Sequence, residues 1–459
     1  MASYDYKSRW QDIVRFYHHL TFHVVPGPNT PSYAIPCLLL PTALLVPPSI
    51  LSHNRLALLF LPVIYACQLH AWVAGGIDVI GVNLVLWSFV LLVLRDPRRT
   101  HRRLWVSSTS TTTVCDNGDG KGESEVERKD RDEIVEEPYP KDMRERIPWV
   151  VTLLVSLRLT GWRIGDPSHD KTQPTPRLKR SDFLRIALPT VVFGFLIMDA
   201  TSLYVETDSY YTTSKMSVDA PFSAPSEDLP TLLIVLRLLP PRLLRSSILA
   251  SQVYAMVTSM FFLPTIPAVG LNAIGLLPNE WSPHTWPVFF GSFSKVWERG
   301  LRGLWGGWWH SMNRQITATL GHELAKSMGI PTRSLLAFGM LTVSAFFFSG
   351  VIHVGMIPPE PESKLLSANE MRLYIAGFFW LQIPAFAIEL AVTKMAGRFV
   401  PSVGGWRITK ALVLAWVASW LCLTLPLLTV PLREIGYWRY YAVPISLLRG
   451  LAGKGWLTW

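Results

Sequence analysis

The stretch LLAFGMLTVSAFFFSGVIHVGMI, residues 335–357, decides the class of fold. It contains no Lys, Arg, Asp or Glu, and it provides the roughly 20 apolar residues that a helix needs to cross about 30 Å of hydrocarbon. Other apolar stretches have a similar length. The sequence therefore predicts an all-α polytopic membrane protein with about eight transmembrane helices, near residues 33–52, 56–74, 77–94, 184–204, 248–276, 335–357, 371–393 and 409–430.

The composition of the chain agrees with a membrane protein. Hydrophobic residues make up 49% of the chain and charged residues 17%, whereas soluble domains carry about 25% charged residues. The formal net charge is +10, but the basic residues cluster in loops between the apolar stretches, which indicates cytosolic loops beside a lipid bilayer and argues against nucleic acid. The four cysteines have no CxxC or metal-ligand spacing, so we expect neither a disulfide framework nor a metal site.

The chain divides into three regions by composition. Residues 1–94 hold three predicted spans, residues 95–147 form a charged linker, and residues 148–459 form the predicted membrane core. The linker runs from a Ser/Thr-rich stretch into alternating basic and acidic residues that cannot bury a core, so the sequence predicts disorder there. The arginines at its start place this loop in the cytosol, and counting back three spans places the N-terminus in the lumen.

The stretch 229–246 has a mixed character. It places Arg237, Arg242 and Arg245 around two consecutive prolines. This combination favours a helix at the membrane interface, or a re-entrant helix, over a free-standing span.

His353 lies deep in the apolar stretch that opens this section, between Gly350 and Gly355. Burial disfavours the charged imidazolium and leaves a neutral ring that can accept a proton, as a general base must. A buried histidine also serves as a hydrogen-bonding residue between helices. Both roles stay open on this residue alone.

Residues 286–314 are aromatic, basic and rich in glycine at once, which is typical of a segment at headgroup depth. If residues 308–328 are helical, His310, Asn313, Arg314 and Thr317 share one face at i, i+3, i+4 and i+7. That polar stripe could line a cavity. The alternative is an interfacial anchor whose cations meet lipid phosphates.

These motifs together resemble the wax-synthase-like branch of the membrane-bound O-acyltransferase superfamily. The resemblance is strongest over residues 280–393 and includes Glu389. It implies a helical bundle with an internal tunnel. Four segments carry it: Leu157–Trp162, Trp286–Gly291, Leu304–Arg314 and Phe346–His353. Two positions depart from the family pattern, with Gly307 in place of an arginine and Ser311 in place of a glutamine.

The resemblance implies roles for single residues. His353 would take the proton of a substrate hydroxyl, and His310 or Asn313 would orient the acceptor or stabilise the oxyanion at the thioester carbonyl. The basic rim would bind the phosphates of an acyl-CoA, to which arginine is well suited. The rim consists of Lys295, Arg299, Arg302 and Arg314, and Trp305 and Trp309 join it as candidate donor-binding residues.

The expected function is an O-acyltransferase of the endoplasmic reticulum membrane with no tightly bound cofactor. Its co-substrate would be acetyl-CoA or another acyl-CoA, and its acceptor a hydroxyl of a hydrophobic terpenoid or meroterpenoid natural product in secondary metabolism. One alternative is a long-chain alcohol acyltransferase that makes wax or sterol esters. A second alternative is a transporter or scaffold, although the chain has no internal repeat of the kind that transporters often show. No Gly-x-Ser-x-Gly elbow, His-x-x-x-Asp site or phosphate-binding glycine loop is present.

Overall fold

The computed structural model is mostly helical. It describes residues 30–114, 126–156, 158–159, 161–165, 179–222, 235, 237–278, 281–283, 286, 289–309, 312–361, 363, 365–399, 406–438 and 443–458.

The helices and strands follow one another in this order. The N-terminal part contains α2 (Thr30–Leu45), α3 (His53–Gly75), α4 (Val79–Phe89) with η1 (Val90–Leu94), α5 (Pro97–Thr100), β1 (His101–Val114), β2 (Val126–Glu137), α6 (Met143–Val155) and β3 (Trp162–Ile164). The middle part contains α7 (Arg180–Thr207), η2 (Ser209–Tyr211), α9 (Pro241–Ala273), α10 (Ser294–Gly303), η5 (Leu304–Trp308) and α11 (Arg314–Ser327). The last part contains α12 (Leu335–His353), η6 (Val354–Met356), α13 (Ala368–Trp380), α14 (Gln382–Phe399), α15 (Trp406–Thr424), α16 (Pro426–Glu434) and α17 (Leu447–Leu451).

Six helical stretches of the described chain are long and apolar enough to cross a membrane. Three of them join consecutive helices: α12 with η6, α13 with α14, and α15 with α16. The first and third of the eight predicted spans coincide with shorter apolar helices, Pro31–Leu45 and Val79–Leu94. The positions of all eight apolar segments are thus as predicted, and six of them reach spanning length. The chain is a multi-pass integral membrane protein.

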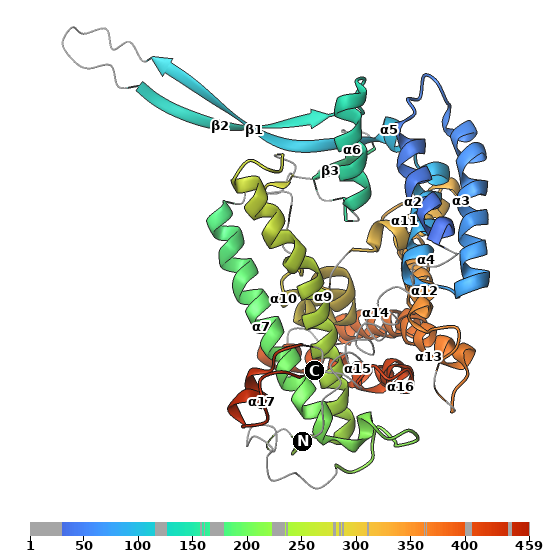
Figure 1. Ribbon diagram of the computed structural model, residues 1–459, viewed down its shortest axis with the longest axis vertical. Coiled ribbons are helices and arrows are strands. Elements are labelled where there is room, and N and C mark those ends of the chain that lie inside the picture. Colours follow the sequence, from blue (N-terminus) through green and yellow to red (C-terminus); the bar gives the residue numbers. More distant parts are fainter. Residues whose placement is uncertain are drawn as a thin grey trace, which may run out of the picture.

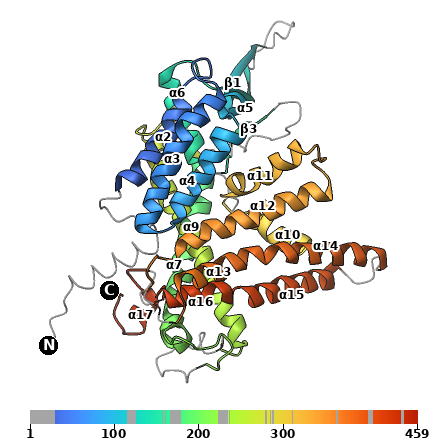
Figure 2. The same cartoon turned by 90° about the vertical axis from the view of Figure 1, so that its right-hand side faces the viewer.

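The helices form three groups (Figures 1 and 2). Helices α2, α3 and α4 pack together with α6 around one buried cluster that includes Trp149 and Trp162. Helices α7 and α9 run side by side along the long axis of the molecule, and α12 to α16 lie across it in stacked rows in Figure 2. The largest buried cluster joins α7 and α9 to α12–α16. His353 ends α12, and the candidate donor-binding residues lie on α10, on η5 and in the stretch up to the start of α11.

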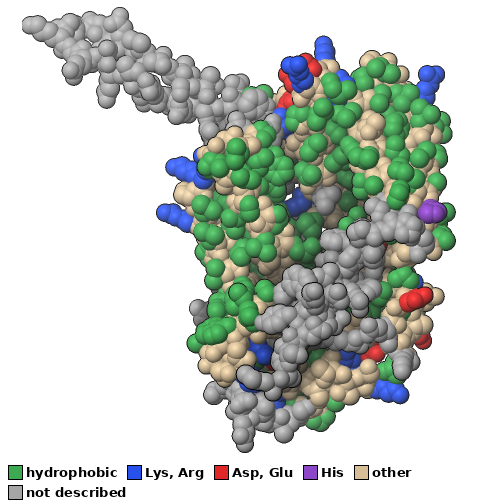
Figure 3. Space-filling model, in the orientation of Figure 1, with side chains coloured by type: hydrophobic (Ala, Val, Ile, Leu, Met, Phe, Trp, Pro, Cys, Tyr) green, Lys and Arg blue, Asp and Glu red, His purple; other side chains and the backbone are tan. Residues whose placement is uncertain are grey.

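Much of the outer surface is apolar. Figure 3 shows hydrophobic side chains covering the face over α7 and α9 and the face over the N-terminal helices. Leu58 and Val73 of α3, for example, are 74% and 81% exposed. Such large exposed apolar surfaces are unfavourable in water, so they indicate contact with lipid.

The interval 95–147 differs from the predicted disordered linker at its described residues. Strands β1 and β2 pair antiparallel in a long hairpin, and β3 pairs with β1 on the other side, in the order β2-β1-β3. Arg103 and Glu137 lie opposite one another in the two strands and form an ion pair of 2.6 Å. The disorder of the linker as a whole stays a prediction. The boundaries of the three regions stay a prediction.

The stretch 229–246 also differs from its prediction at the described residues. From Pro241 onward it is the first part of the long helix α9, and its Arg245 is fully buried. The guanidinium forms an ion pair with Asp208, with Nε 2.8 Å from Oδ2, and it donates hydrogen bonds to the carbonyls of Val218 and Ala220. The sequence did not reveal these partners because they lie in a separate loop.

Candidate functional site

His353 is the last residue of α12 and is half-buried. Its Nδ1 lies 2.7 Å from the carbonyl oxygen of Ser349, one turn earlier. A carbonyl can only accept a hydrogen bond, so Nδ1 carries the proton and the lone pair of the neutral ring is on Nε2. Phe379 of α13 stacks on one face of the imidazole at 4.2 Å. The contacts therefore fix both the tautomer and the orientation that a general base needs.

A continuous series of ring contacts joins His353 to the tryptophan-rich segment. Phe379 touches Phe378, and Phe378 meets Trp305 with 6.1 Å between ring centroids. Trp305 in turn meets Trp309 at 6.0 Å. His353 and the tryptophan-rich segment are thus connected through a series of packed aromatic rings.

The segments around 286–291 and 304–314 meet at two glycines. The N–H of Gly291 donates to the carbonyl of Trp308 at 2.8 Å, and a Cβ on Gly291 would collide with the carbonyl of Gly307. A Cβ on Gly307 would lie 2.8 Å from the Cβ of Lys295. The departure from the family pattern at position 307 has a physical reason, since a larger side chain there would displace Lys295. Arg158, from the upstream motif, donates to the carbonyl of Phe289 at 3.3 Å. Residues 157, 160, 287, 288, 310 and 311 of these motifs lie outside the described part of the chain.

Helix α10 is interrupted at Gly300, whose φ of +61° is rarely adopted by residues with a side chain. The carboxylate of Glu389 fills the space beside this glycine. It accepts a hydrogen bond from the N–H of Leu301 at 2.6 Å and is bonded by the N–H and Nε of Arg302 at 3.3 and 2.9 Å. The sequence indicated Glu389 only through the family resemblance, in which it closes a Phe-rich apolar stretch.

Gln382 also holds the segment that follows Gly300, and the sequence reasoning missed it. It is fully buried at the start of α14, and its Oε1 accepts hydrogen bonds from the indole N–H groups of Trp305 and Trp420, both at 3.2 Å. Its amide nitrogen donates to the carbonyl of Phe378 at 2.9 Å. An uncharged polar residue at the edge of a predicted span gives only a weak sequence signal.

The basic rim divides into paired and unpaired members. Lys295 forms an exposed ion pair with Glu298 at 3.0 Å, and Arg302 is paired with Glu389. Arg299 and Arg314 are exposed, and no ion pair joins either of them to another described residue. The two unpaired arginines are therefore better placed than Arg302 to meet an anion.

The predicted helix 308–328 is shorter than expected. Residues 304–308 form a separate turn, Trp309 is extended, and α11 begins only at Arg314. Arg314 points to the exterior, whereas Thr317 is buried and donates to the carbonyl of Asn313 at 2.9 Å. The polar stripe is therefore not continuous over its described members. The prediction for His310 falls outside the described residues.

The N-terminal helices reach the turn that follows His353. A Cβ on Gly355 would lie 2.5 Å from backbone atoms of Asp78 and Val79, and Gly76 lies against the ring of Pro359. Asp78 caps α4 by accepting from the N–H of Gly81 at 2.7 Å. The packing of α4 therefore limits the positions available to the end of α12.

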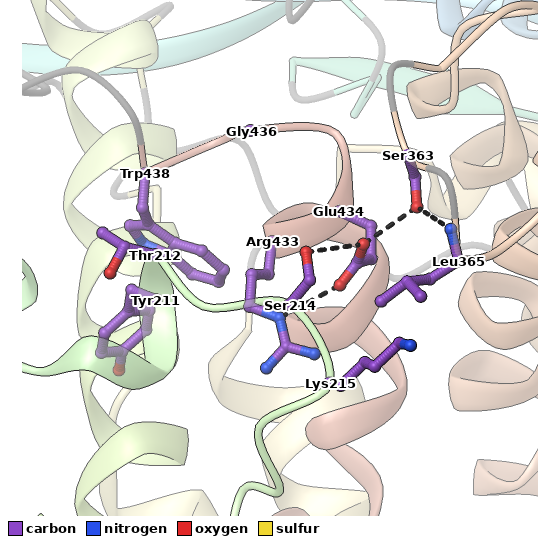
Figure 4. Close-up of a pocket in the computed structure, with 10 residues that line it drawn as sticks. All are labelled: Tyr211, Thr212, Ser214, Lys215, Ser363, Leu365, Arg433, Glu434, Gly436 and Trp438. Atoms are coloured by element: carbon purple, nitrogen blue, oxygen red, sulfur yellow. Dashed lines mark hydrogen bonds and ion pairs between the residues drawn. The ribbon is translucent and has the colours of Figure 1, made fainter.

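A cavity of about 410 Å³ lies elsewhere, at the end of α16. Ser214 and Ser363 both donate to Glu434 at its wall, and Lys215 and Arg433 lie nearby (Figure 4). No residue of the predicted site lines this cavity. We therefore do not assign the chemistry to it.

Comparison with known proteins gives a consistent result. Residues 286–368 match the family described as the membrane bound O-acyl transferase family. The chain is 24% identical to the acetyltransferase eriL of Hericium erinaceus, over 68% of this chain and 73% of the relative. It is 33% identical to the acetyltransferase nanB of Aspergillus nanangensis, over 41% of this chain and 43% of the relative, and 26% identical to the acetyltransferase sirH of Emericella nidulans, over 46% and 40%. No solved structure matches the chain.

Proposed function

We propose that the chain is a membrane-bound O-acyltransferase, the family that residues 286–368 match, and that it transfers an acetyl group from acetyl-CoA to a hydroxyl of a hydrophobic natural product. The observation that carries this proposal is the similarity to fungal proteins that are named acetyltransferases. The acceptor we propose is a terpenoid or meroterpenoid alcohol of secondary metabolism. Its class rests on the sequence resemblance, and the aromatic surroundings of His353 suit a ligand of that kind.

The reaction we propose uses His353 as the general base. Nε2 takes the proton of the acceptor hydroxyl while the oxygen attacks the carbonyl carbon of the thioester. The tetrahedral intermediate then collapses, the C–S bond breaks, and the proton held by His353 passes to the leaving thiolate to give CoA and the ester. No tightly bound cofactor enters this scheme.

The charge that develops on the thioester oxygen needs a hydrogen-bond donor. We propose His310 or Asn313 for this role, and one well-placed donor of this kind contributes about 3 kcal/mol. The phosphates of the donor would meet Arg299 and Arg314, with Lys295, Arg302, Trp305 and Trp309 shaping the donor end of the site. Replacing His310 by Ala should then reduce turnover strongly in a folded protein, and an unchanged rate would exclude the role.

The proposal extends to topology. We place the protein in the endoplasmic reticulum membrane, with the interval 95–147 in the cytosol and residues 148–459 as the acyltransferase core around an internal tunnel. The arginine-rich start of the interval supports this orientation. Protease protection of tagged loops in sealed microsomes tests it directly.

The test of the activity is an acyl-transfer assay in membranes that contain the full chain. Acetyl-CoA and palmitoyl-CoA are offered with a panel of terpenoid alcohols, sterols and long-chain alcohols, and products are identified by mass spectrometry. We expect acetyl esters of terpenoid alcohols. Palmitoyl esters of sterols or long-chain alcohols would instead identify a wax-ester or sterol-ester enzyme. Failure of transfer with both donors across the panel would favour a transporter or scaffold.

A further inference from the structure

Two polar side chains on one face of α14 are buried inside an apolar part of the molecule. Gln382 is 0% and Glu389 is 6% exposed, and they lie seven residues apart, which places them on the same side of the helix two turns from one another. Polar groups in a membrane-embedded helix are costly unless partners satisfy them. Both residues have such partners, and each of them has at least one partner in the same segment, residues 301–305.

Glu389 acts as an N-terminal cap supplied by another helix. Its carboxylate accepts from the first two N–H groups after the break at Gly300, those of Leu301 and Arg302. A carboxylate is favourable at the N-terminus of a helical turn, where unpaired N–H groups carry partial positive charge. The indole N–H of Trp416 on α15 donates to the same carboxylate at 3.1 Å. The backbone turn is thus tied to two helices at once.

The side chain of Arg302 also binds Glu389. Its Nε lies 2.9 Å from Oε1 of Glu389, and the side chain of Glu389 is 6% exposed while that of Arg302 is 28% exposed. A phosphate group would have to compete with this buried carboxylate for the same charge. Arg299 and Arg314 are exposed, and no buried carboxylate among the described residues pairs with either of them.

We infer that Glu389 and Gln382 are positioning residues that hold Arg302 and Trp305 in place to shape the acyl-donor side of the site. Arg302 and Trp305 then keep residues 301–305 in the conformation that the acyl donor needs. Arg299 and Arg314 supply the contacts to its phosphates. The inference rests on the proposed function, because it assigns the segment to the donor end of that reaction. It also makes the C-terminal helices part of a site whose family match ends at residue 368.

The kinetic test compares acetyl-CoA with acetyl-pantetheine, a thioester that lacks the phosphates of the nucleotide. Glu389→Gln is expected to raise KM for both thioesters about tenfold, the effect of losing one hydrogen bond to a charged group, and to leave the KM of the acceptor unchanged. Gln382→Leu is expected to act in the same direction. The matched control is Glu206→Gln, which removes a carboxylate bonded by Arg449 at 2.7 and 3.0 Å, away from this segment, and should change neither KM.

Two kinetic outcomes would overturn the inference. A rise in KM confined to acetyl-CoA would mean that the Arg302–Glu389 pair acts at the phosphates. A lower yield of active enzyme with unchanged KM values would mean that the two residues only stabilise the fold.

A second measurement does not depend on turnover. Amide hydrogen exchange of residues 300–309 is followed in the purified full chain, in wild type, Glu389→Gln and Glu206→Gln. We expect about tenfold faster exchange at Leu301 and Arg302 in the first variant and wild-type rates in the second. Unchanged exchange in Glu389→Gln would refute the positioning role, whereas a wild type that transfers no acetyl group would refute the proposed function and leave this result to stand.

Discussion

At the residue scale, the imidazole of His353 is constrained on two sides. Ser349 fixes the proton on Nδ1, and Phe379 covers one ring face. The lone pair of the neutral ring is therefore on Nε2. A side chain at the end of a membrane helix therefore has the properties that a hydroxyl-activating base requires.

Replacing His353 by Ala is expected to reduce acyl transfer by about 100-fold or more, because general-base catalysis contributes roughly 10²–10⁴. The amount of protein inserted in the membrane should stay close to wild type, since the ring is only half-buried. Initial rates normalised to the quantity of inserted protein give the answer. The control is His322→Ala on α11, an exposed histidine that should leave the rate unchanged. Transfer at the wild-type rate in His353→Ala would contradict the assignment.

His101, at the start of β1, is expected to make stability depend on pH. Burial, reinforced by the charge of Arg95, lowers the pKa of His101 to about 3 from its usual 6.5. Between these values the unfolded chain binds a proton that the folded chain does not. Stability is therefore fully present above about pH 6.5 and falls as the pH is lowered toward 3, by up to about 1.4 kcal/mol per pH unit.

The apparent melting temperature of the detergent-purified protein at pH 7.5, 6 and 5 measures this effect. It should fall with pH in the wild type and fall less in His101→Asn. Parallel curves for the two proteins would show that another group governs the dependence.

At the element scale, α11 and α12 are joined by a small polar contact inside an apolar interface. Ser344 donates to the carbonyl of Thr317 at 2.7 Å and accepts from the N–H of Gly321 at 3.1 Å. Gly321 permits this closeness, since a Cβ there would lie 2.5 Å from the carbonyl of Met340. The contact sets the position of α11, which follows directly on Asn313, relative to the helix that carries His353.

Ser344→Ala should lower the free energy of unfolding by about 1–3 kcal/mol, because it leaves a buried carbonyl and a buried N–H without this partner. Ser327→Ala, at the exposed end of the same α11, removes a local hydrogen bond to Leu324 and should cost less than about 0.5 kcal/mol. Denaturant titrations in mixed micelles compare the two. Equal losses would show that the Ser344 bonds add nothing to the helix pairing.

At the scale of the whole molecule, a buried ion pair fastens the loop after α7 to α9. Asp208 and Arg245 are both 0% exposed in their side chains, and the guanidinium also lies over the ring of Tyr210 at 4.6 Å. A neighbouring pair, Asp219 with Arg242, joins the same loop and helix at the surface, with side chains 55% and 35% exposed. The two pairs differ mainly in burial.

Asp208→Asn is expected to destabilise the protein by about 3–5 kcal/mol, because it leaves the charge of Arg245 buried and uncompensated. Asp219→Asn should cost under about 1 kcal/mol, since water screens an exposed pair. Thermal unfolding of both variants in the same detergent measures the difference. A similar loss of stability in the two variants would show that burial does not decide how much an ion pair contributes here.

Sequence reasoning located the parts of the candidate site but not its internal contacts. It singled out His353 and the segment 286–314, because an imidazole in an apolar helix and a basic, aromatic, glycine-rich stretch are both unusual locally. It did not find Gln382, and it did not foresee that Arg302 would be paired with Glu389 across 87 positions of the chain. Neither the role of Gln382 nor this ion pair can be recognised from the residues that are close by in the sequence.

The sequence alone determined where the helices of the membrane region lie, since the free energy of transferring a stretch into lipid depends on the composition of that stretch. Tertiary structure decided which polar groups are buried together: Glu389 with the break at Gly300, Arg245 with Asp208, and the two strands in the interval expected to be disordered. These choices depend on partners distant in the chain, because a charge or an N–H group can be buried only where folding brings its counterpart within hydrogen-bonding distance.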